Sequence, residues 1–406
     1  MTSRIPSAGL GLAAGLALSL ALTGCQAAPA AGPAPSAESD TARGDGHGAI
    51  AGAQELAEPA LHLTSIAPDG GIHHLDLIDE RSEELGRIAP ADSLETDGRF
   101  LFAARDGGVS IIDSGVWTWN HIDHFHYYEA PAAVLGDVEG PGVPTVVTSD
   151  HGAGISFDGE AVLLDLDELK TGEIVERFRL DVAAGDGMVV PLPSGALLTD
   201  AAGLRHVDAA GETRGDVPCE DPAGSIATNV GVVVGCADGA VLAVTDAAGT
   251  TFERIPYPSD AAARATAFAA REGRPTVAGL SGTDAVWLLD TRERSWARIE
   301  AGEEIVRVAA VDDADQLVVA LTADGAVLVL DGATGERVAR TEPLVTAALA
   351  DPALAKGVEL AVDTHRTYLN GPAEHAMYEI DPADGARIAR TFETDHVPVH
   401  ATETGR

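Results

Sequence analysis

From residue 60 onward, the chain repeats a phrase of two apolar strands joined by tight turns. The clearest copy has one strand over 317–321, a turn at 324–325, a second strand over 327–330 and a closing Asp331. Closing aspartates recur at intervals of 37 to 52 residues, at Asp76, Asp113, Asp165, Asp208, Asp246, Asp290, Asp331 and Asp381. This period is typical of propeller blades built from four short antiparallel strands. The repeat therefore predicts an all-β fold, a single β-propeller.

The two ends of the repeat region predict how the ring closes. The first copy, which starts at Leu61, lacks a leading strand, and residues 397–401 can supply it. Pairing of the N- and C-terminal strands would remove two exposed sheet edges. We therefore expect about eight four-stranded blades, with seven as the alternative because weak copies are easily miscounted. The closing aspartates are expected to cap turns.

The charge balance limits the partners of this chain. It has 26 Lys and Arg against 64 Asp and Glu, so its formal net charge is −38. Nucleic-acid binding depends on Lys and Arg side chains that neutralise phosphates, so the composition argues against a nucleic-acid partner and against a polybasic membrane surface. With 45 Gly and only 4% aromatic residues, the chain has the turn-rich composition of a β protein. We expect a monomer.

Residues 1–24 have the pattern of an export signal. Arg4 supplies a positive start, and the apolar run over 9–22 is short for a transmembrane helix. The run ends in Leu-Thr-Gly-Cys at 22–25, which resembles the bacterial lipobox, where the Cys becomes lipid-modified and forms the new N-terminus. The sequence thus predicts a lipoprotein outside the cytoplasm, anchored to the cell membrane through Cys25.

Residues 25–59 are rich in Ala, Pro and Gly and show no hydrophobic periodicity. Such a composition cannot bury a core, so we expect a flexible tether before a propeller domain over 60–406. His47 is expected to be an ordinary linker residue, with metal capture as the alternative.

Two cysteines remain in the predicted propeller, Cys219 and Cys236. An even pair outside the membrane favours a disulfide. Metal binding by the pair is the weaker alternative, because the sequence has no CxxC spacing.

Residues 117–130, Trp-Thr-Trp-Asn-His-Ile-Asp-His-Phe-His-Tyr-Tyr-Glu-Ala, are the richest candidate for chemistry. They place four possible metal ligands within six positions: His121, Asp123, His124 and His126. Neutral imidazole is a common ligand of zinc, copper and nickel. The alternative is an aromatic-rich loop in which the histidines are incidental.

The predicted strands suggest how these ligands meet. In an extended segment His124 and His126 share one face, and a turn at 122–123 would bring His121 round to them. The segment follows a strand-like stretch over 109–119 and precedes a strand expected at 132–135, so we place it in or beside a connection between blades. His151, in a turn of the following blade, can complete a zinc site of four ligands.

Other histidines are weaker candidates. An isolated histidine such as His62 or His206 is expected to be an ordinary surface or core residue. If the last strand closes the ring, His400 lies on its innermost strand and His365 enters the next strand. Either can face the central channel of a propeller.

The stretch His-Ile-Asp-His-Phe-His-Tyr-Tyr at 121–128 resembles the signature of the AztD-type zinc metallochaperones. This resemblance implies an exported β-propeller that accompanies a zinc ABC importer and passes Zn²⁺ to its solute-binding protein. It extends over most of 60–406, including the strand that begins at Met188 and the cysteine pair. The chain departs from the family pattern at 185–187 and 222–224, where Gly-Asp-Gly and Pro-Ala-Gly replace expected histidines. Asp186 is the remaining candidate ligand there.

Three functions compete. The first is a non-catalytic protein that binds and delivers metal. The second is a metal-dependent hydrolase or lactonase-like enzyme, for which Glu129 is the nearest candidate base in the sequence. The sequence contains no phosphate loop, nucleophile elbow or HExxH motif that would favour an enzyme. The third is a propeller that binds only protein partners and needs no metal.

Overall fold

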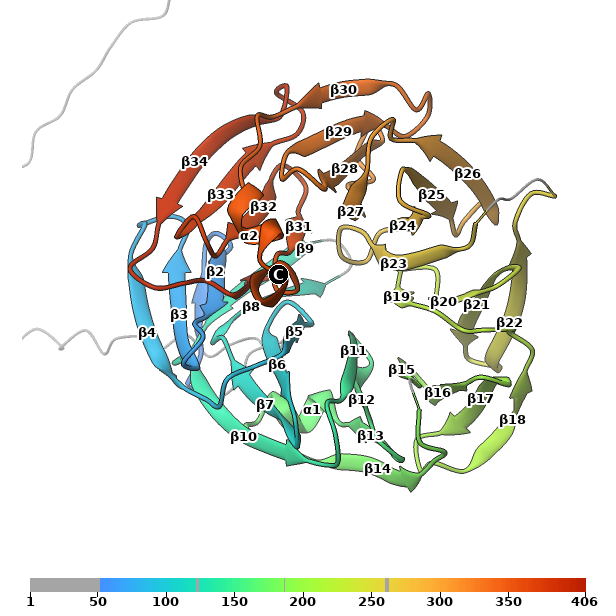
Figure 1. Ribbon diagram of the computed structural model, residues 1–406. Coiled ribbons are helices and arrows are strands. Elements are labelled where there is room, and N and C mark those ends of the chain that lie inside the picture. The colour runs from blue at the N-terminus through green and yellow to red at the C-terminus, as the bar shows by residue number, and fades with distance from the viewer. Residues whose placement is uncertain (1–51, 122–123, 186, 260–262) are drawn as a thin grey trace, which may run out of the picture. The chain divides into compact units, whose positions relative to one another are not determined.

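Strands make up almost all the regular structure in the computed structural model of the chain, which describes residues 52–121, 124–185, 187–259 and 263–406. Within these residues, eight four-stranded sheets and one three-stranded sheet form (Figure 1). Three short helices accompany them: α1 (Leu166–Leu169), α2 (Thr346–Ala350) and α3 (Pro352–Ala355). The predicted all-β class is confirmed.

We number the four-stranded sheets by chain order. Sheet 1 contains β35 (His400–Thr404), β2 (His62–Ile66), β3 (Gly71–Asp76) and β4 (Ser82–Arg87). Sheet 2 contains β5 (Ser93–Thr96), β6 (Phe100–Arg105), β7 (Gly108–Asp113) and β10 (Ala133–Glu139). Sheet 3 contains β11 (Thr145–Ser149), β12 (Gly152–Phe157), β13 (Glu160–Leu164) and β14 (Glu176–Asp181). Sheet 4 contains β15 (Val189–Leu192), β16 (Gly195–Asp200), β17 (Gly203–Asp208) and β18 (Thr213–Val217).

The second half of the chain repeats this pattern. Sheet 5 contains β19 (Ser225–Ala227), β20 (Val232–Cys236), β21 (Gly239–Asp246) and β22 (Gly249–Pro256). Sheet 6 contains β23 (Ala265–Ala269), β24 (Thr276–Ser281), β25 (Ala285–Asp290) and β26 (Ser295–Glu300). Sheet 7 contains β27 (Ile305–Ala310), β28 (Leu317–Thr322), β29 (Val327–Asp331) and β30 (Arg337–Arg340). Sheet 8 contains β31 (Leu360–Val362), β32 (Thr367–Gly371), β33 (Ala376–Asp381) and β34 (Arg387–Glu393).

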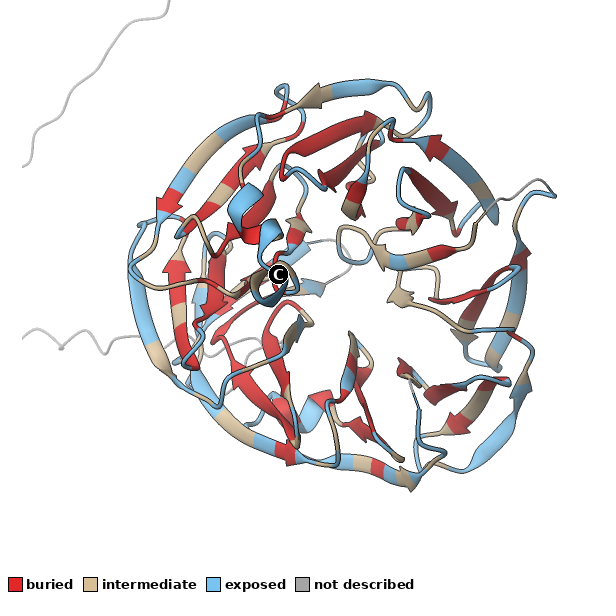
Figure 2. Ribbon diagram, in the orientation of Figure 1, coloured by how far each residue is buried: buried red, intermediate tan, exposed pale blue. Residues whose placement is uncertain are grey.

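Burial explains why the middle strands carry the strongest apolar signal. Every residue of β28 is buried, whereas the first four residues of β18, at a sheet edge, are exposed (Figure 2). A strand covered on both faces is apolar along its length, while an outer strand also meets water. The fourth strand of each sheet is therefore the hardest to recognise in the sequence.

Apolar clusters join each sheet to the next. Ile66 and Leu101 belong to the cluster between sheets 1 and 2, and further clusters join the following sheets in chain order. Leu63 and Tyr368 belong to a cluster that joins sheet 8 back to sheet 1. β35 also pairs antiparallel with β2, Ile66 opposite His400. The predicted pairing of the two chain ends is present, but β35 begins at His400, three residues later than expected.

The closing aspartates cap turns, as predicted. In each repeat the side chain accepts a hydrogen bond from a backbone N–H two or three residues later, at Asp76, Asp113, Asp165, Asp208, Asp246, Asp290, Asp331 and Asp381. This is the ordinary turn chemistry of Asp, so these residues serve the scaffold.

The three-stranded sheet differs from the prediction. It contains β1 (Gln54–Leu56), β9 (His124–Glu129) and β8 (Val116–His121), in that order. The stretch 132–135 does not open the next blade: β10 pairs with β7 as the fourth strand of sheet 2. The β8–β9 hairpin is therefore an insertion between two strands of one sheet. β1 lies inside the segment expected to be a tether.

Candidate metal site

The root of the β8–β9 hairpin is fixed by a glycine and a buried ion pair. Gly115 has a φ of 78°, and a Cβ added there would lie 2.2 Å from the carbonyl oxygen of Ala130. The N–H of Ala130 donates to the Gly115 carbonyl at 2.7 Å. Asp113 accepts from the Gly115 N–H at 2.9 Å and from the Arg99 guanidinium through both carboxylate oxygens, at 2.9 and 2.6 Å. Such a bidentate pair fixes geometry as well as charge.

Aromatic packing continues from this root into the hairpin. The Arg99 guanidinium lies 3.9 Å from the centre of the Trp117 ring, and Trp117 stacks on Tyr128 at 5.3 Å. Both rings are buried. Thr118 Oγ1 donates to the Gly405 carbonyl at 2.7 Å, which ties β8 to the end of the chain. The hairpin is thus packed at its base and along one strand.

The strand register brings the predicted histidines together. The backbone of His121 pairs with His124, and Trp119 pairs with His126. The rings of His124 and His126 lie 4.6 Å apart between centres, on the same face of β9. His126 is 8% exposed, whereas His124 is exposed. The expected shared face of His124 and His126 is therefore present, whereas the turn expected at 122–123 lies outside the described residues. Asp123 and the side chain of His121 lie outside the described residues.

Glu55 completes this arrangement, and no sequence signal pointed to it because it stands in the Ala- and Pro-rich segment. β1 pairs with β9, Glu55 opposite Tyr128, and a carboxylate oxygen of Glu55 lies 2.7 Å from Nδ1 of His126. A carboxylate oxygen accepts, so Nδ1 of His126 donates this hydrogen bond, and a metal ion would bind through Nε2. Metal-binding histidines in proteins typically have this second partner.

The remaining predicted ligands lie elsewhere in the fold. His151 is in the β11–β12 turn, as expected, half-buried, with Nε2 3.2 Å from Asp150. His400 is buried on β35, and its Nε2 lies 3.1 Å from the Ala91 carbonyl, so it donates there. His365 is exposed in the β31–β32 turn. Asp186 is outside the described residues.

The described part of the chain contains no group of three or more His, Cys, Asp or Glu side chains placed to hold a metal ion. That part includes His124, His126 and His151 but omits Asp123 and the side chain of His121. The residues that fit metal chemistry are therefore the two β9 imidazoles, with Glu55 behind His126.

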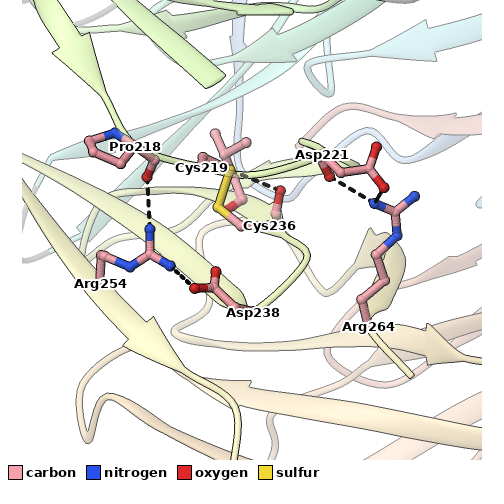
Figure 3. The surroundings of a disulfide bond; sticks show 9 residues. Pro218, Cys219, Asp221, Cys236, Asp238, Arg254 and Arg264 are labelled. Atoms are coloured by element: carbon pink, nitrogen blue, oxygen red, sulfur yellow. Dashed lines mark hydrogen bonds and ion pairs between the residues drawn. A yellow bond between two sulfur atoms is a disulfide. The ribbon is translucent and has the colours of Figure 1, made fainter. Parts of the chain in front are cut away.

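Cys219 and Cys236 form the predicted disulfide, with Cα atoms 5.2 Å apart. It joins the connection after β18 to the end of β20, and both residues are buried. Arg254 donates to the Pro218 carbonyl and pairs with Asp238 beside it (Figure 3). The bond leaves neither thiol for metal.

A second group of histidines was not expected from the sequence. The rings of His62 and His74 lie 4.1 Å apart at one end of sheet 1. His73 stacks on His396 at 3.6 Å. Neighbouring strands β2 and β3 bring the first pair together, a contact that the spacing of single histidines does not show.

No family model and no curated protein matches the chain. Among solved structures, two of AztD from Citrobacter koseri, one of them apo, superpose with a TM-score of 0.73, at 20% and 21% identity. Each superposition covers 86% of this chain and 98% of the AztD chain. The chain has the fold of AztD. This agrees with the resemblance seen at 121–128 and shows that the fold is a propeller.

A dehydrogenase shares the architecture more distantly. The dihydro-heme d1 dehydrogenase NirN, in complex with DHE, gives a TM-score of 0.52 at 16% identity, covering 86% of this chain and 76% of its own. The architecture is therefore shared with an enzyme as well as with AztD. Among the described residues, no helix has the length and apolarity needed to cross a membrane.

Proposed function

We propose that this chain is a non-catalytic metallochaperone outside the cytoplasm, which binds Zn²⁺ and delivers it to the solute-binding protein of an ABC importer. The observation that carries the proposal is the β8–β9 hairpin, in which His124 and His126 share a face and Glu55 accepts a hydrogen bond from Nδ1 of His126. The fold shared with AztD supports it.

The exposure of the hairpin residues suits a site that releases its zinc ion to a partner protein. His126 and Tyr128 are buried while His124 is exposed, so one ligand is held by the scaffold and the other lies at the surface, where a partner can approach it. His121 and Asp123, beside them in the sequence, are proposed to complete the set, with His151 as the next candidate. Asp186, His365 and His400 remain weaker candidates.

The position of Glu129 supports a binding function over hydrolysis. A zinc hydrolase needs a general base beside its metal-bound water. Residues of β9 alternate between faces, which places Glu129 on the face opposite His124 and His126. The only base that the sequence suggested near this site therefore faces away from the two imidazoles.

We further propose that residues 60–406 form a closed propeller of eight blades. The eight four-stranded sheets, the cluster between sheets 8 and 1, and the β2–β35 pairing support this. The signal over 1–24 and the lipobox at Cys25 support a lipoprotein, tethered to the membrane by residues 25–59. The disulfide fits an oxidising compartment.

The test is a zinc titration of the full chain beside a His121/His124/His126→Ala variant, with metal content measured by mass spectrometry. We expect tight binding in the wild type and its loss in the variant. Transfer is then tested by mixing the zinc-loaded chain with the apo solute-binding protein and measuring metal in each after separation. A wild-type chain that binds no zinc would make the metal-independent, partner-binding propeller the better interpretation.

A further inference from the structure

The two faces of the sheet formed by β8, β9 and β1 differ in how far they are covered. Strand alternation places Trp117, His126 and Tyr128 on one face, and all three are buried. On the opposite face, Phe125 is 55% exposed, and Glu129 is exposed as well. The first face is therefore packed against the protein, whereas the second face meets solvent.

Phe125 belongs to a continuous apolar strip on the second face. Tyr127 stands two positions along β9, and β1 places Leu56 opposite Tyr127, with both residues half-buried. We call Leu56, Phe125 and Tyr127 the apolar strip. Among the aromatic residues that the structure describes, Phe125 is the only exposed one. Single exposed apolar residues are ordinary on a protein surface, but contiguous ones mark places where another molecule binds.

An acidic cleft continues this face toward the root of the hairpin. Glu129, the next residue on the same face of β9, lines an open cleft of about 360 Å³. Glu83, on β4 of sheet 1, also lines the cleft and is exposed. No Lys or Arg is among the described residues that line it. A partner that complements this face therefore presents apolar groups to the strip and positive side chains to the cleft.

The position of Phe125 indicates which partner this is. It stands between His124 and His126 on β9. A protein that takes a zinc ion from these imidazoles has to bring its own ligands to about 2 Å from the ion, so its surface reaches this part of the hairpin. Strand alternation places Phe125 on the side of β9 away from both imidazoles. Contact with Phe125 therefore holds a partner beside the ion without covering the ligands.

We propose that the apolar strip and the acidic cleft are the docking surface for the solute-binding protein that receives the zinc ion, with Phe125 as its anchor. The proposal rests on the proposed function for the identity of this partner. An aromatic side chain that enters a pocket of the partner carries a large share of the binding energy of an interface. Opposite charges around it speed the approach of the partner and make association depend on salt.

The test variant is Phe125→Ala, and the matched control is Val143→Ala. Val143 is 57% exposed, close to the exposure of Phe125. It follows β10 at the end of sheet 2 that lies away from the hairpin root, because β10 pairs its first residue with Asp113 and its last with Gly108. Thermal unfolding checks that both variants fold like the wild type, and a zinc titration of each checks that the imidazoles are undisturbed.

Docking is measured by isothermal titration calorimetry between the metal-free full chain and the metal-free solute-binding protein, so that the result does not depend on zinc. We expect Phe125→Ala to raise the Kd at least about 10-fold and Val143→Ala to leave it unchanged. Added salt should weaken docking of the wild type. It should weaken docking less in Glu83→Gln/Glu129→Gln, which lacks the two carboxylates of the cleft.

Equal Kd values for Phe125→Ala and Val143→Ala would overturn the docking surface, as would a wild-type chain that does not dock, even where the zinc titration supports the hairpin site. Weaker docking of Phe125→Ala, in a chain whose wild type binds no zinc, would retain the docking surface and reject zinc delivery. A wild-type dimer that Phe125→Ala converts to a monomer in size-exclusion chromatography would assign the strip to a second copy of the chain and overturn the proposed partner.

Discussion

At the scale of single residues, Glu55 is the side chain that most directly adjusts the hairpin site. Its carboxylate oxygen lies 2.7 Å from Nδ1 of His126 and accepts a hydrogen bond from it, so a metal ion would bind through Nε2. Glu55→Gln replaces this acceptor with an amide that holds the ring less firmly. Removal of such a partner typically weakens metal binding by about 10- to 100-fold. We expect a zinc Kd raised within that range, measured by competition with a chromophoric chelator.

The control for Glu55 is Glu58→Gln, an exposed position three residues along and outside β1. Glu58→Gln should leave the zinc Kd unchanged. Glu55→Asp, which keeps a carboxylate, should bind zinc more tightly than Glu55→Gln. If all three variants bind zinc like the wild type, Glu55 does not position His126.

His396 predicts a dependence of stability on pH. Burial and the neighbouring His73 lower its pKa to about 4 from the ordinary 6.5. The unfolded chain therefore binds this proton more readily, so the stability contribution is complete above about pH 6.5 and is lost as the pH falls toward about 4. The Tm should fall between pH 7 and pH 4.5, and less steeply in His396→Gln. His365→Gln, at an exposed turn position, should follow the wild-type profile.

The contacts predicted from the sequence join residues that are close together along the chain, whereas the contacts that were missed join residues far apart. His124 and His126 stand two positions apart on one strand, so strand alternation alone predicts their common face. Glu55 reaches His126 across 71 positions, and His62 meets Asp76 through pairing of β2 with β3. Contacts of this kind depend on register between strands, which a single sequence does not reveal.

At the scale of elements, the hairpin depends on Gly115. Its positive φ, and the carbonyl oxygen of Ala130 only 2.2 Å from where a Cβ would lie, leave no room for a side chain. Gly115→Ala should displace the hairpin root, lower the Tm and weaken zinc binding. Gly172→Ala is the matched control, because Gly172 also has a positive φ but no atom within 4 Å of an added Cβ. Equal zinc affinity in both variants would show that the geometry of the hairpin root does not affect metal binding.

The disulfide between Cys219 and Cys236 also stabilises the structure at this scale, because it links two neighbouring elements. It closes a loop across a sequence separation of 17. A crosslink over a loop of this length contributes about 3 kcal/mol by restricting the unfolded chain. We expect Cys219→Ala/Cys236→Ala to lower the free energy of unfolding by about that amount in urea titrations. Reduction of the wild type should produce a similar loss, and an unchanged urea midpoint in both would contradict this account.

The element that was placed wrongly from the sequence shows the limit of repeat patterns. The apolar start of β10 after Pro131 resembles the opening strand of a new blade, and the repeat spacing offers no reason to doubt it. Whether a strand extends an existing sheet or starts another depends on which sheet edge it pairs with. β10 pairs with the edge of β7, so β8 and β9 form an insertion, at whose root Trp117 and Tyr128 are in contact.

At the scale of the whole molecule, the fold depends on β35. This strand pairs with β2, and it carries Ala401 into the cluster shared by sheets 1 and 8. Deletion of residues 400–406 would leave the edge of β2 open and expose that cluster to water. We expect the Tm to fall by roughly 5 °C or more and the chain to self-associate, because an open strand edge pairs with other copies.

Thermal unfolding and size-exclusion chromatography measure these two effects. A peptide of residues 397–406 added to the truncated chain should restore both the Tm and the monomer, since it supplies the missing strand. A scrambled peptide of the same composition should restore neither. A truncated chain that stays monomeric with an unchanged Tm would mean that the clusters between sheets hold the ring without β35, and that closure by strand pairing is not what stabilises it.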